Sequence, residues 1–291
     1  MKKVLVTGAT GFLGHAVIQE LLRNEEIEIL AIGGRPEDKV NPLPEDPRLA
    51  LFLLDDLFTR DFPVVDTVVN CAFARSNDAM LLAQALDFTE RLAARLTSMK
   101  AKSVLNISSQ GVYKRLPAGT LSTEESPIDP VDMYSLAKYA SERLFAVSGI
   151  PYVSQIRMAS LMMPQRFLSF FIRKALDGEP FTLTAPNQYT ALMDVSDAAS
   201  GIAALTALAP EMRASIYNLG IGKQYSLLQY AESVREIGRK LGVSVAFDVS
   251  DNGTETCAGM DCSRLMADTG WAPRIFKDEM ILNLFRMYGA K

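Results

Sequence analysis

The chain has 291 residues, of which 48% are hydrophobic and 22% are charged, and its formal net charge is −4. This composition is typical of a soluble globular protein, and the length suits one large domain or a main domain with a smaller lobe. Lysine and arginine are scattered along the chain, so no nucleic-acid partner is expected. With an odd number of cysteines and one histidine, neither a disulfide framework nor a metal site is expected.

The apolar stretches are too short or too interrupted to insert into a membrane. The chain opens with lysines and an apolar run, but Thr7 and Gly8 end that run at once, which is not the pattern of a signal peptide. The segment 160–172 is interrupted by Pro164 and Arg166. We therefore expect a cytoplasmic protein with no membrane partner.

A glycine-rich stretch follows the first apolar run. Val4–Val6 suits a strand that is buried on both faces, and a helical pattern begins at residue 16. Glycines between them permit a tight turn, and the free N–H groups of a helix start can bind a pyrophosphate. This context favours a dinucleotide site over a purely structural turn. The residues expected to bind the cofactor here are Gly8, Thr10, Gly11, Phe12, Leu13 and Gly14.

Strand and helix patterns then alternate through the first half of the chain. A long helix is expected from residue 78 to about 99. Further strands are expected at 27–32, 50–54, 67–72, 103–108 and 152–158. Alternation of this kind predicts a parallel sheet with helices on both faces and with ligands at the carboxyl ends of its strands.

Beyond residue 161 the expected elements are shorter and less regular. They are helices at 167–176, 195–208 and 227–241 and strands at 216–219 and 243–247. We predict a dinucleotide-binding domain over 1–160, which regains a strand at about 214–220. The residues 161–213 and 221–291 would form a substrate lobe. The predicted fold class is thus α/β, a doubly wound parallel sheet with a smaller carboxyl-terminal lobe.

Three residues in the middle of the chain suggest the chemistry. Ser109 follows the strand at 103–108, so its hydroxyl should lie in the ligand crevice. Tyr134 and Lys138 are one helical turn apart, and a nearby ammonium would lower the pKa of the phenol towards neutrality. Tyrosine and lysine at this spacing also occur by chance on solvated helix faces. Their position downstream of Ser109, within a dinucleotide-binding frame, favours the catalytic interpretation.

Taken together, these motifs resemble the extended short-chain dehydrogenase/reductase family, which includes nucleotide-sugar epimerases, dehydratases and reductases. The resemblance covers nearly the whole chain. Its other marks are Glu142 and the segments 194–199, 217–220 and 269–273. It implies a Rossmann fold in which Ser109, Tyr134 and Lys138 are catalytic and Lys138 also holds the nicotinamide ribose.

The resemblance also implies further cofactor contacts. Asp56 and Leu57 would contact the adenine, and the backbone of Ala72, Phe73 and Ala74 would line the cofactor. NAD enzymes of this kind usually carry an acidic residue at the end of the second strand, where Gly33 stands here.

A cation near that strand end bears on the choice of cofactor. Arg35 follows Gly33 by two residues, and a guanidinium suits a 2′-phosphate. The sequence therefore favours NADP, with NAD as the alternative. The interpretation of Arg35 as a solvated loop cation stays open.

The residue after Ser109 bears on the reaction. Nucleotide-sugar dehydratases of the family carry an Asp-Glu pair where this chain has Gln110 and Gly111, so dehydration is disfavoured. In the family, an asparagine that binds the nucleotide-sugar often stands where this chain has Ser160. The expected substrate-binding residues are Ser109, Gln110, Tyr134 and Ser160.

We expect an NAD(P)-dependent oxidoreductase that interconverts a secondary alcohol and a ketone on a sugar or nucleotide-sugar, with a ketoreductase as the first choice. An epimerase that retains NAD, and a catalytically idle dinucleotide sensor, are the alternatives. Whether helices pair in a homodimer is left open.

Overall fold

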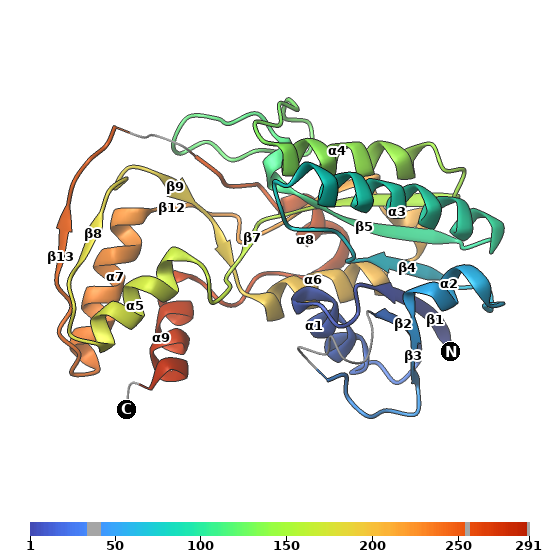
Figure 1. Cartoon of the computed structure of the whole chain (residues 1–291), viewed down its shortest axis with the longest axis horizontal. Coiled ribbons are helices and arrows are strands. Elements are labelled where there is room, and N and C mark those ends of the chain that lie inside the picture. The colour runs from blue at the N-terminus through green and yellow to red at the C-terminus, as the bar shows by residue number, and fades with distance from the viewer. Residues whose placement is uncertain (34–41, 254–256, 290–291) are drawn as a thin grey trace.

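A parallel sheet lies at the centre of the larger part of the computed structural model, which describes residues 1–33, 42–253 and 257–289 (Figure 1). Within these residues its strands are β1 Lys2–Thr7, β2 Ile27–Gly33, β3 Leu49–Leu53, β4 Thr67–Asn70, β5 Ser103–Ser109, β6 Tyr152–Met158 and β11 Ile216–Leu219. Their order across the sheet is β11-β6-β5-β4-β1-β2-β3. Every neighbouring pair is parallel, as the alternating pattern predicted.

Helices cover both faces of this sheet. α1 (Phe12–Leu21) and α6 (Val195–Ala207) lie on one face. α2 (Leu54–Thr59), α3 (Ala79–Ser98) and α4 (Met133–Ala146) lie on the other, where α3 and α4 run side by side (Figure 1). The prediction of a doubly wound α/β fold is confirmed.

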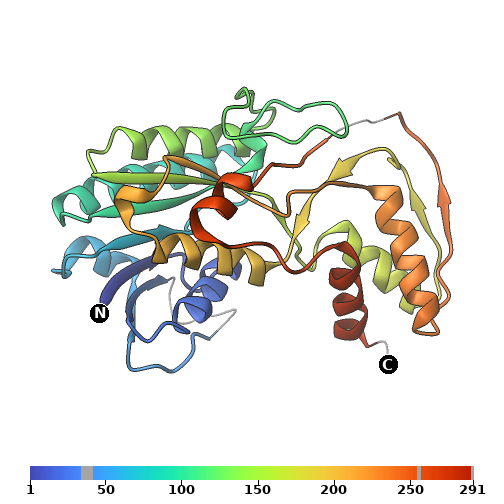
Figure 2. The same cartoon turned by 180° about the vertical axis from the view of Figure 1, so that it is seen from behind.

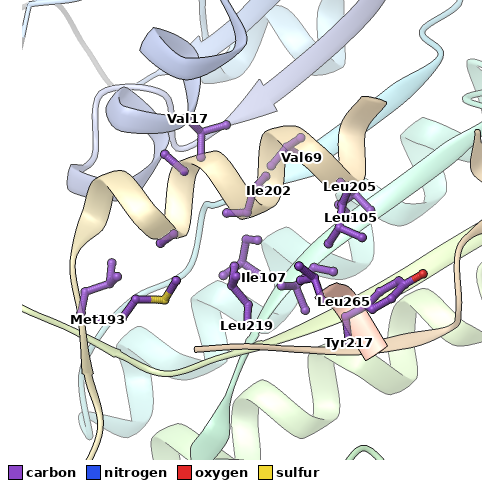
Figure 3. Packing of buried hydrophobic residues seen from close by; sticks show 14 of the residues in the cluster. Val17, Val69, Leu105, Ile107, Met193, Ile202, Leu205, Tyr217, Leu219 and Leu265 are labelled. Atoms are coloured by element: carbon purple, nitrogen blue, oxygen red, sulfur yellow. The ribbon is translucent and has the colours of Figure 1, made fainter. Parts of the chain in front are cut away.

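Successive side chains of each strand point to opposite faces of the sheet, so they pack alternately into the hydrophobic clusters on its two sides. Val4 and Val6 of β1 pack in the cluster under α1 and α6, whereas Leu5 packs with the cluster under α3. In Figure 3, Ile202 and Leu205 of α6 point towards the sheet. Burial of these apolar surfaces is the main stabilising contribution to the fold.

A smaller lobe lies beyond the end of the sheet, as Figure 2 shows from behind. Its helices are α5 (Phe167–Leu176), α7 (Leu227–Lys240) and α9 (Lys277–Tyr288). They pack with the short parallel pair β8 (Phe181–Leu183) and β13 (Phe247–Val249) around a core of their own. Stacked rings of Phe171, Phe181 and Phe247 run through that core.

Short elements connect the two parts. β7 (Ser160–Leu161) pairs with β10 (Leu192–Met193), and β9 (Tyr189–Thr190) pairs with β12 (Tyr225–Ser226). The remaining elements are α8 (Ser263–Thr269) and the 3-10 turns η2 (Gln110–Val112) and η3 (Pro210–Met212).

The packing of α6 differs from the predicted division of the chain. Residues 161–213 were assigned to the lobe, but α6 lies within them and packs Ile202 against the sheet in the same cluster as Val17 of α1. Leu265 of α8 joins that cluster as well. Segments after residue 160 therefore contribute to both cores.

The last predicted strand is displaced. A strand was expected at 243–247, but the observed β13 begins at Phe247. The N–H of Val243 donates to the carbonyl oxygen of Gly238 at 2.8 Å, so the chain there still caps α7 and pairs with β8 only from Phe247 onward. Among the described helices, none is both long and apolar enough to cross a bilayer.

Candidate active site

The glycine-rich turn between β1 and α1 depends on the absence of side chains. Gly8 has a φ of +65°, and a Cβ added there would lie 2.9 Å from the amide nitrogen of Ala72. A Cβ on Gly14 would lie 2.2 Å from the carbonyl oxygen of Gly8. In the described chain, Gly11 caps α1 without a side-chain hydrogen bond, and the first turn holds no acidic residue. The residues present therefore fit the pyrophosphate of a dinucleotide.

The end of β2 lies beside this turn. A Cβ on Gly33 would approach Cγ2 of Thr10 at 2.9 Å and Cδ1 of Leu51 at 3.3 Å. An acidic side chain at this position would have to displace its neighbours. Arg35, the predicted partner of a 2′-phosphate, lies outside the described residues.

The predicted adenine contacts lie in and around α2. One carboxylate oxygen of Asp56 accepts the N–H of Leu53 at 3.0 Å, and the other pairs with Nε of Arg60 at 2.8 Å. The side chain of Leu57 is fully buried under α3, and its carbonyl oxygen accepts Nε of Arg95 at 2.8 Å. The assignment of Asp56 and Leu57 to the adenine stays a prediction.

Ser109 ends β5 and starts the turn η2. Its Oγ accepts the N–H of Gly111 at 3.1 Å. A Cβ on Gly111 would lie 2.3 Å from Oγ of Ser135, so the missing side chain lets η2 pack directly against the start of α4. This close approach brings Ser109 and Tyr134 to the same cavity.

Tyr134 lies in the first turn of α4. Asp132 caps this helix by accepting the N–H of Ser135 at 2.7 Å, and Asn77 accepts the N–H of Tyr134 at 3.1 Å. Burial raises the pKa of the Tyr134 phenol, and the positive charges of Arg75 and Arg166 oppose that rise.

Lys138 lies one turn further on and is 5% exposed. Its Nζ donates to the carbonyl oxygen of Ile107 at 2.7 Å and sits 4.0 Å from the ring centroid of Phe73. Burial lowers the pKa of Lys138 to about 7, while Cys71 and Glu142 act in the opposite direction. The ring of Phe73 also meets that of Tyr134 edge-on, with centroids 6.2 Å apart.

From its position one helical turn away, Lys138 was expected to lower the pKa of Tyr134. In the structure the cations that lower this pKa are Arg75 and Arg166. Sequence reasoning did not single out Arg75, although its place just after Ala74, beyond the carboxyl end of β4, was an available signal.

A buried ion pair links α4 to the neighbouring strands of the sheet. Glu142 accepts Nε and Nη2 of Arg157 at 3.0 and 2.8 Å and Oγ of Ser108 at 2.5 Å. The pair joins α4 to β5 and β6, and both side chains are almost fully buried. A bidentate, hydrogen-bonded pair of this kind fixes the position of the helix that carries Tyr134.

A cavity of about 660 Å³ lies over the carboxyl ends of the strands. The predicted substrate residues that line it are Ser109, Gln110, Tyr134 and Ser160. Nε2 of Gln110 donates to Oγ of Ser160 at 3.2 Å, and Oε1 of Gln110 is buried with no partner among the described residues. Gln188 and Tyr189 face the cavity from the lobe side. The cavity is therefore built by both parts of the molecule.

A doubly wound sheet with a glycine-rich first turn and a cavity at the carboxyl ends of its strands is the arrangement of dinucleotide-dependent proteins. Residues 4–220 match the model of the NAD dependent epimerase/dehydratase family, and the chain belongs to that family. This confirms the resemblance inferred from the sequence and supports an enzyme over an idle sensor.

Individual relatives are distant. A dTDP-glucose 4,6-dehydratase of Neisseria meningitidis serogroup B is 23% identical, over 94% of this chain and 89% of its own length. The uncharacterized UDP-glucose epimerase YtcB of Bacillus subtilis is 24% identical, over 88% of this chain and 89% of its own.

A solved structure shows the same fold. The UDP-glucuronic acid 4-epimerase of Bacillus cereus in complex with UDP-glucuronic acid and NAD has a TM-score of 0.80 at 19% identity, covering 98% of this chain and 99% of that one.

Proposed function

We propose that the protein interconverts a secondary alcohol and a ketone on a nucleotide-sugar, with a nicotinamide dinucleotide as the hydride carrier. The observation that carries this proposal is that Ser109, Gln110, Tyr134 and Ser160 line one cavity at the edge of the sheet where α1 begins. The names of the relatives support the nucleotide-sugar.

Each side chain has a distinct part in this reaction. The dinucleotide, when bound, supplies or accepts the hydride. Because Oγ of Ser109 already accepts the N–H of Gly111, its own hydrogen is free to be donated to the substrate oxygen. The Tyr134 hydroxyl exchanges a proton with that oxygen. When it is protonated, Lys138 uses one donor on the Ile107 carbonyl, which leaves two for a ribose hydroxyl.

Residues after Ser109 argue against water elimination. The Gln110 side chain is an amide, which donates and accepts hydrogen bonds but does not exchange a proton at neutral pH. Gly111 has no side chain, and the space that one would occupy is taken by Ser135. A pair of carboxyl groups for acid and base work is therefore missing at these positions.

Ketone reduction with an exchangeable dinucleotide is our first choice, and NADP is preferred to NAD. The absence of a carboxylate at Gly33, where a Cβ would approach Thr10 and Leu51, supports the cofactor preference. Epimerisation is the second candidate, favoured by the structural likeness to a 4-epimerase. A reductase consumes NADPH in step with product, whereas an epimerase forms product without net consumption.

The role of Tyr134 is tested by Tyr134→Phe, with Tyr139→Phe on the same helix as the matched control. Loss of the proton-exchanging hydroxyl should lower kcat by about 10²–10⁴-fold, while NADPH or NADH binding, followed by fluorescence, stays unchanged. Turnover is measured on a panel of nucleotide-sugar 4-ketones. Full activity of Tyr134→Phe would contradict the mechanism, and tighter binding of NADH than NADPH would contradict the cofactor preference.

The outer face of the neighbouring helices α3 and α4 supports a homodimer. Met80 and Leu81 of α3 and Met133 and Leu136 of α4 are exposed large hydrophobic side chains. Covering them with the same face of a second copy would remove apolar surface from water.

A further inference from the structure

A second cavity, of about 700 Å³, lies at the amino ends of the strands, on the edge of the sheet opposite the active site. We call it the amino-end cavity. Its lining includes Lys2 at the start of β1, Asp66 before β4, Lys102 before β5 and Pro151 before β6. This edge lies away from the lobe, near the mark of the N-terminus in Figure 1. Doubly wound sheets bind their ligands at the carboxyl ends of the strands, so the proposed reaction does not use this cavity.

One part of the lining is apolar and rigid. Ala101 and Ile150 are 2% and 8% exposed, so their side chains belong to the interior that the cavity meets. Pro151 and Pro210 present rigid rings, and Tyr152, which is 43% exposed, adds an aromatic one. A cavity of this volume with flat, rigid side chains suits the planar ring of a small molecule.

Lys2 brings a positive charge to the same cavity. Its Nζ donates to the carbonyl oxygen of Thr206, and Nη2 of Arg213 donates to that same oxygen at 3.2 Å. Among the described residues, neither cation forms an ion pair with a carboxylate. Burial lowers the pKa of Lys2, and the charge of Arg213 adds to that shift, while Asp66 and Glu211 oppose it. An anion beside Lys2 would offset the repulsion between the two cations.

The acidic side chains of the lining leave this charge unbalanced. One oxygen of Asp66 pairs with Nζ of Lys102 at 2.5 Å, and the other accepts the backbone N–H of Lys3 at 2.9 Å. Glu211 is exposed to solvent, as is Lys100. Because lysines outnumber carboxylates in the lining, the amino-end cavity has a net positive charge.

We propose that the amino-end cavity is a second ligand site, which binds an aromatic carboxylate with its ring on the apolar lining and its charge on Lys2. The carboxylate supplies the counter-charge that Lys2 and Arg213 lack, through a charge-assisted hydrogen bond. A small inorganic anion would leave the apolar lining in water, and a neutral ring would leave the lysine without a counter-charge. The dinucleotide does not compete for this site, because the active-site cavity lies at the other edge of the sheet.

Titration calorimetry with 2-naphthoate tests the site, first on the protein alone and then in saturating NADH. The matched ligand is 2-naphthalenemethanol, which has the same ring and no charge. We expect 2-naphthoate to bind about tenfold more tightly than the alcohol, with an affinity that NADH does not change. No binding of 2-naphthoate, equal affinities for the two compounds, or displacement of 2-naphthoate by NADH would overturn the proposal.

Two substitutions locate the probe in the amino-end cavity. Lys2→Gln removes the charge and Tyr152→Ala removes the aromatic ring, and we expect each to weaken 2-naphthoate binding about tenfold. Lys3→Gln is the control for the charge, because Lys3 points to the other face of β1 and pairs with Glu28. Phe170→Ala, at an exposed ring of α5, is the control for the ring. Unchanged affinity in Lys2→Gln or Tyr152→Ala, or an equal loss in the controls, would contradict the assignment.

Discussion

Lys138 shows how a single residue can be tuned by its surroundings. It is nearly fully buried between the Ile107 carbonyl and the face of Phe73, and among the described residues it has no carboxylate within ion-pair distance. Desolvation is therefore the largest influence and lowers the pKa of Lys138 to about 7.

This burial predicts how stability depends on pH. The pKa of Lys138 is about 7 in the folded protein and about 10.4 when unfolded, so between these values the unfolded chain binds more protons. The free energy of unfolding should rise with pH across this window and level off below pH 7. Relative to Lys138→Met, the unaltered protein should gain on the order of 2 kcal/mol between pH 7 and pH 9.

Chemical denaturation at the two pH values measures this gain. Lys240→Met is the control, because Lys240 is exposed and pairs with Glu236 on the surface of α7. Its curve should follow that of the unaltered protein. Parallel pH dependence of the unaltered protein and Lys138→Met would show that Lys138 is not desolvated as described.

At the scale of elements, a row of buried polar side chains crosses the sheet. Thr7 donates to Asn70 at 2.6 Å, Asn70 to Asn106 at 2.9 Å, and Asn106 to Oε1 of Gln155 at 2.8 Å. Nε2 of Gln155 then donates to the carbonyl oxygen of Glu142 in α4 at 3.1 Å. The four side chains occupy matching register positions on β1, β4, β5 and β6. The row therefore links the end of the strand before the glycine turn to the helix that carries Tyr134.

Breaking the middle of this row should be costly. Asn106→Leu removes a donor and an acceptor and leaves Asn70 and Gln155 unsatisfied in the core, where each unmade hydrogen bond costs about 1–3 kcal/mol. We expect a loss of about 3 kcal/mol in the free energy of unfolding, measured by urea denaturation. Asn187→Ala, at an exposed asparagine, should change it by less than about 0.5 kcal/mol. Equal effects of the two substitutions would contradict the structural importance of the row.

At the scale of the whole molecule, the core of the lobe is separate from the clusters that pack on the sheet, and the active-site cavity is lined by residues of both parts. The cluster of α1, α6 and the sheet fixes the dinucleotide side, and the aromatic cluster of the lobe fixes the substrate side.

The proposed homodimer belongs to this scale as well. Leu136 is 58% exposed on α4, and Leu136→Asp would place a charge in the centre of the proposed interface. We expect the unaltered protein to have the mass of a dimer, and Leu136→Asp that of a monomer, by size-exclusion chromatography with light scattering. Met287→Asp, at an exposed position of α9, should leave the mass unchanged. A monomeric unaltered protein would contradict the homodimer.

The sequence by itself determined the fold class and the order of the main elements. Apolar runs such as Val4–Val6 and Tyr152–Met158 identified strands, and the glycines between β1 and α1 identified the turn, because these signals depend on neighbouring residues in the chain. Ser109 was expected in the ligand crevice for the same reason, since the carboxyl ends of parallel strands meet at one edge, whereas Tyr134 was joined to it through the resemblance to the family.

Only the tertiary structure decided the contacts between residues that are far apart in the chain. It placed α6 against α1, joined Gln110 to Ser160, and brought Arg75 and Arg166 together beside Tyr134. It also buried Lys138, and the cations that lower the pKa of Tyr134 are Arg75 and Arg166 instead of Lys138. Burial and the mutual distance of charges arise from packing in three dimensions, and no local pattern of residues encodes them.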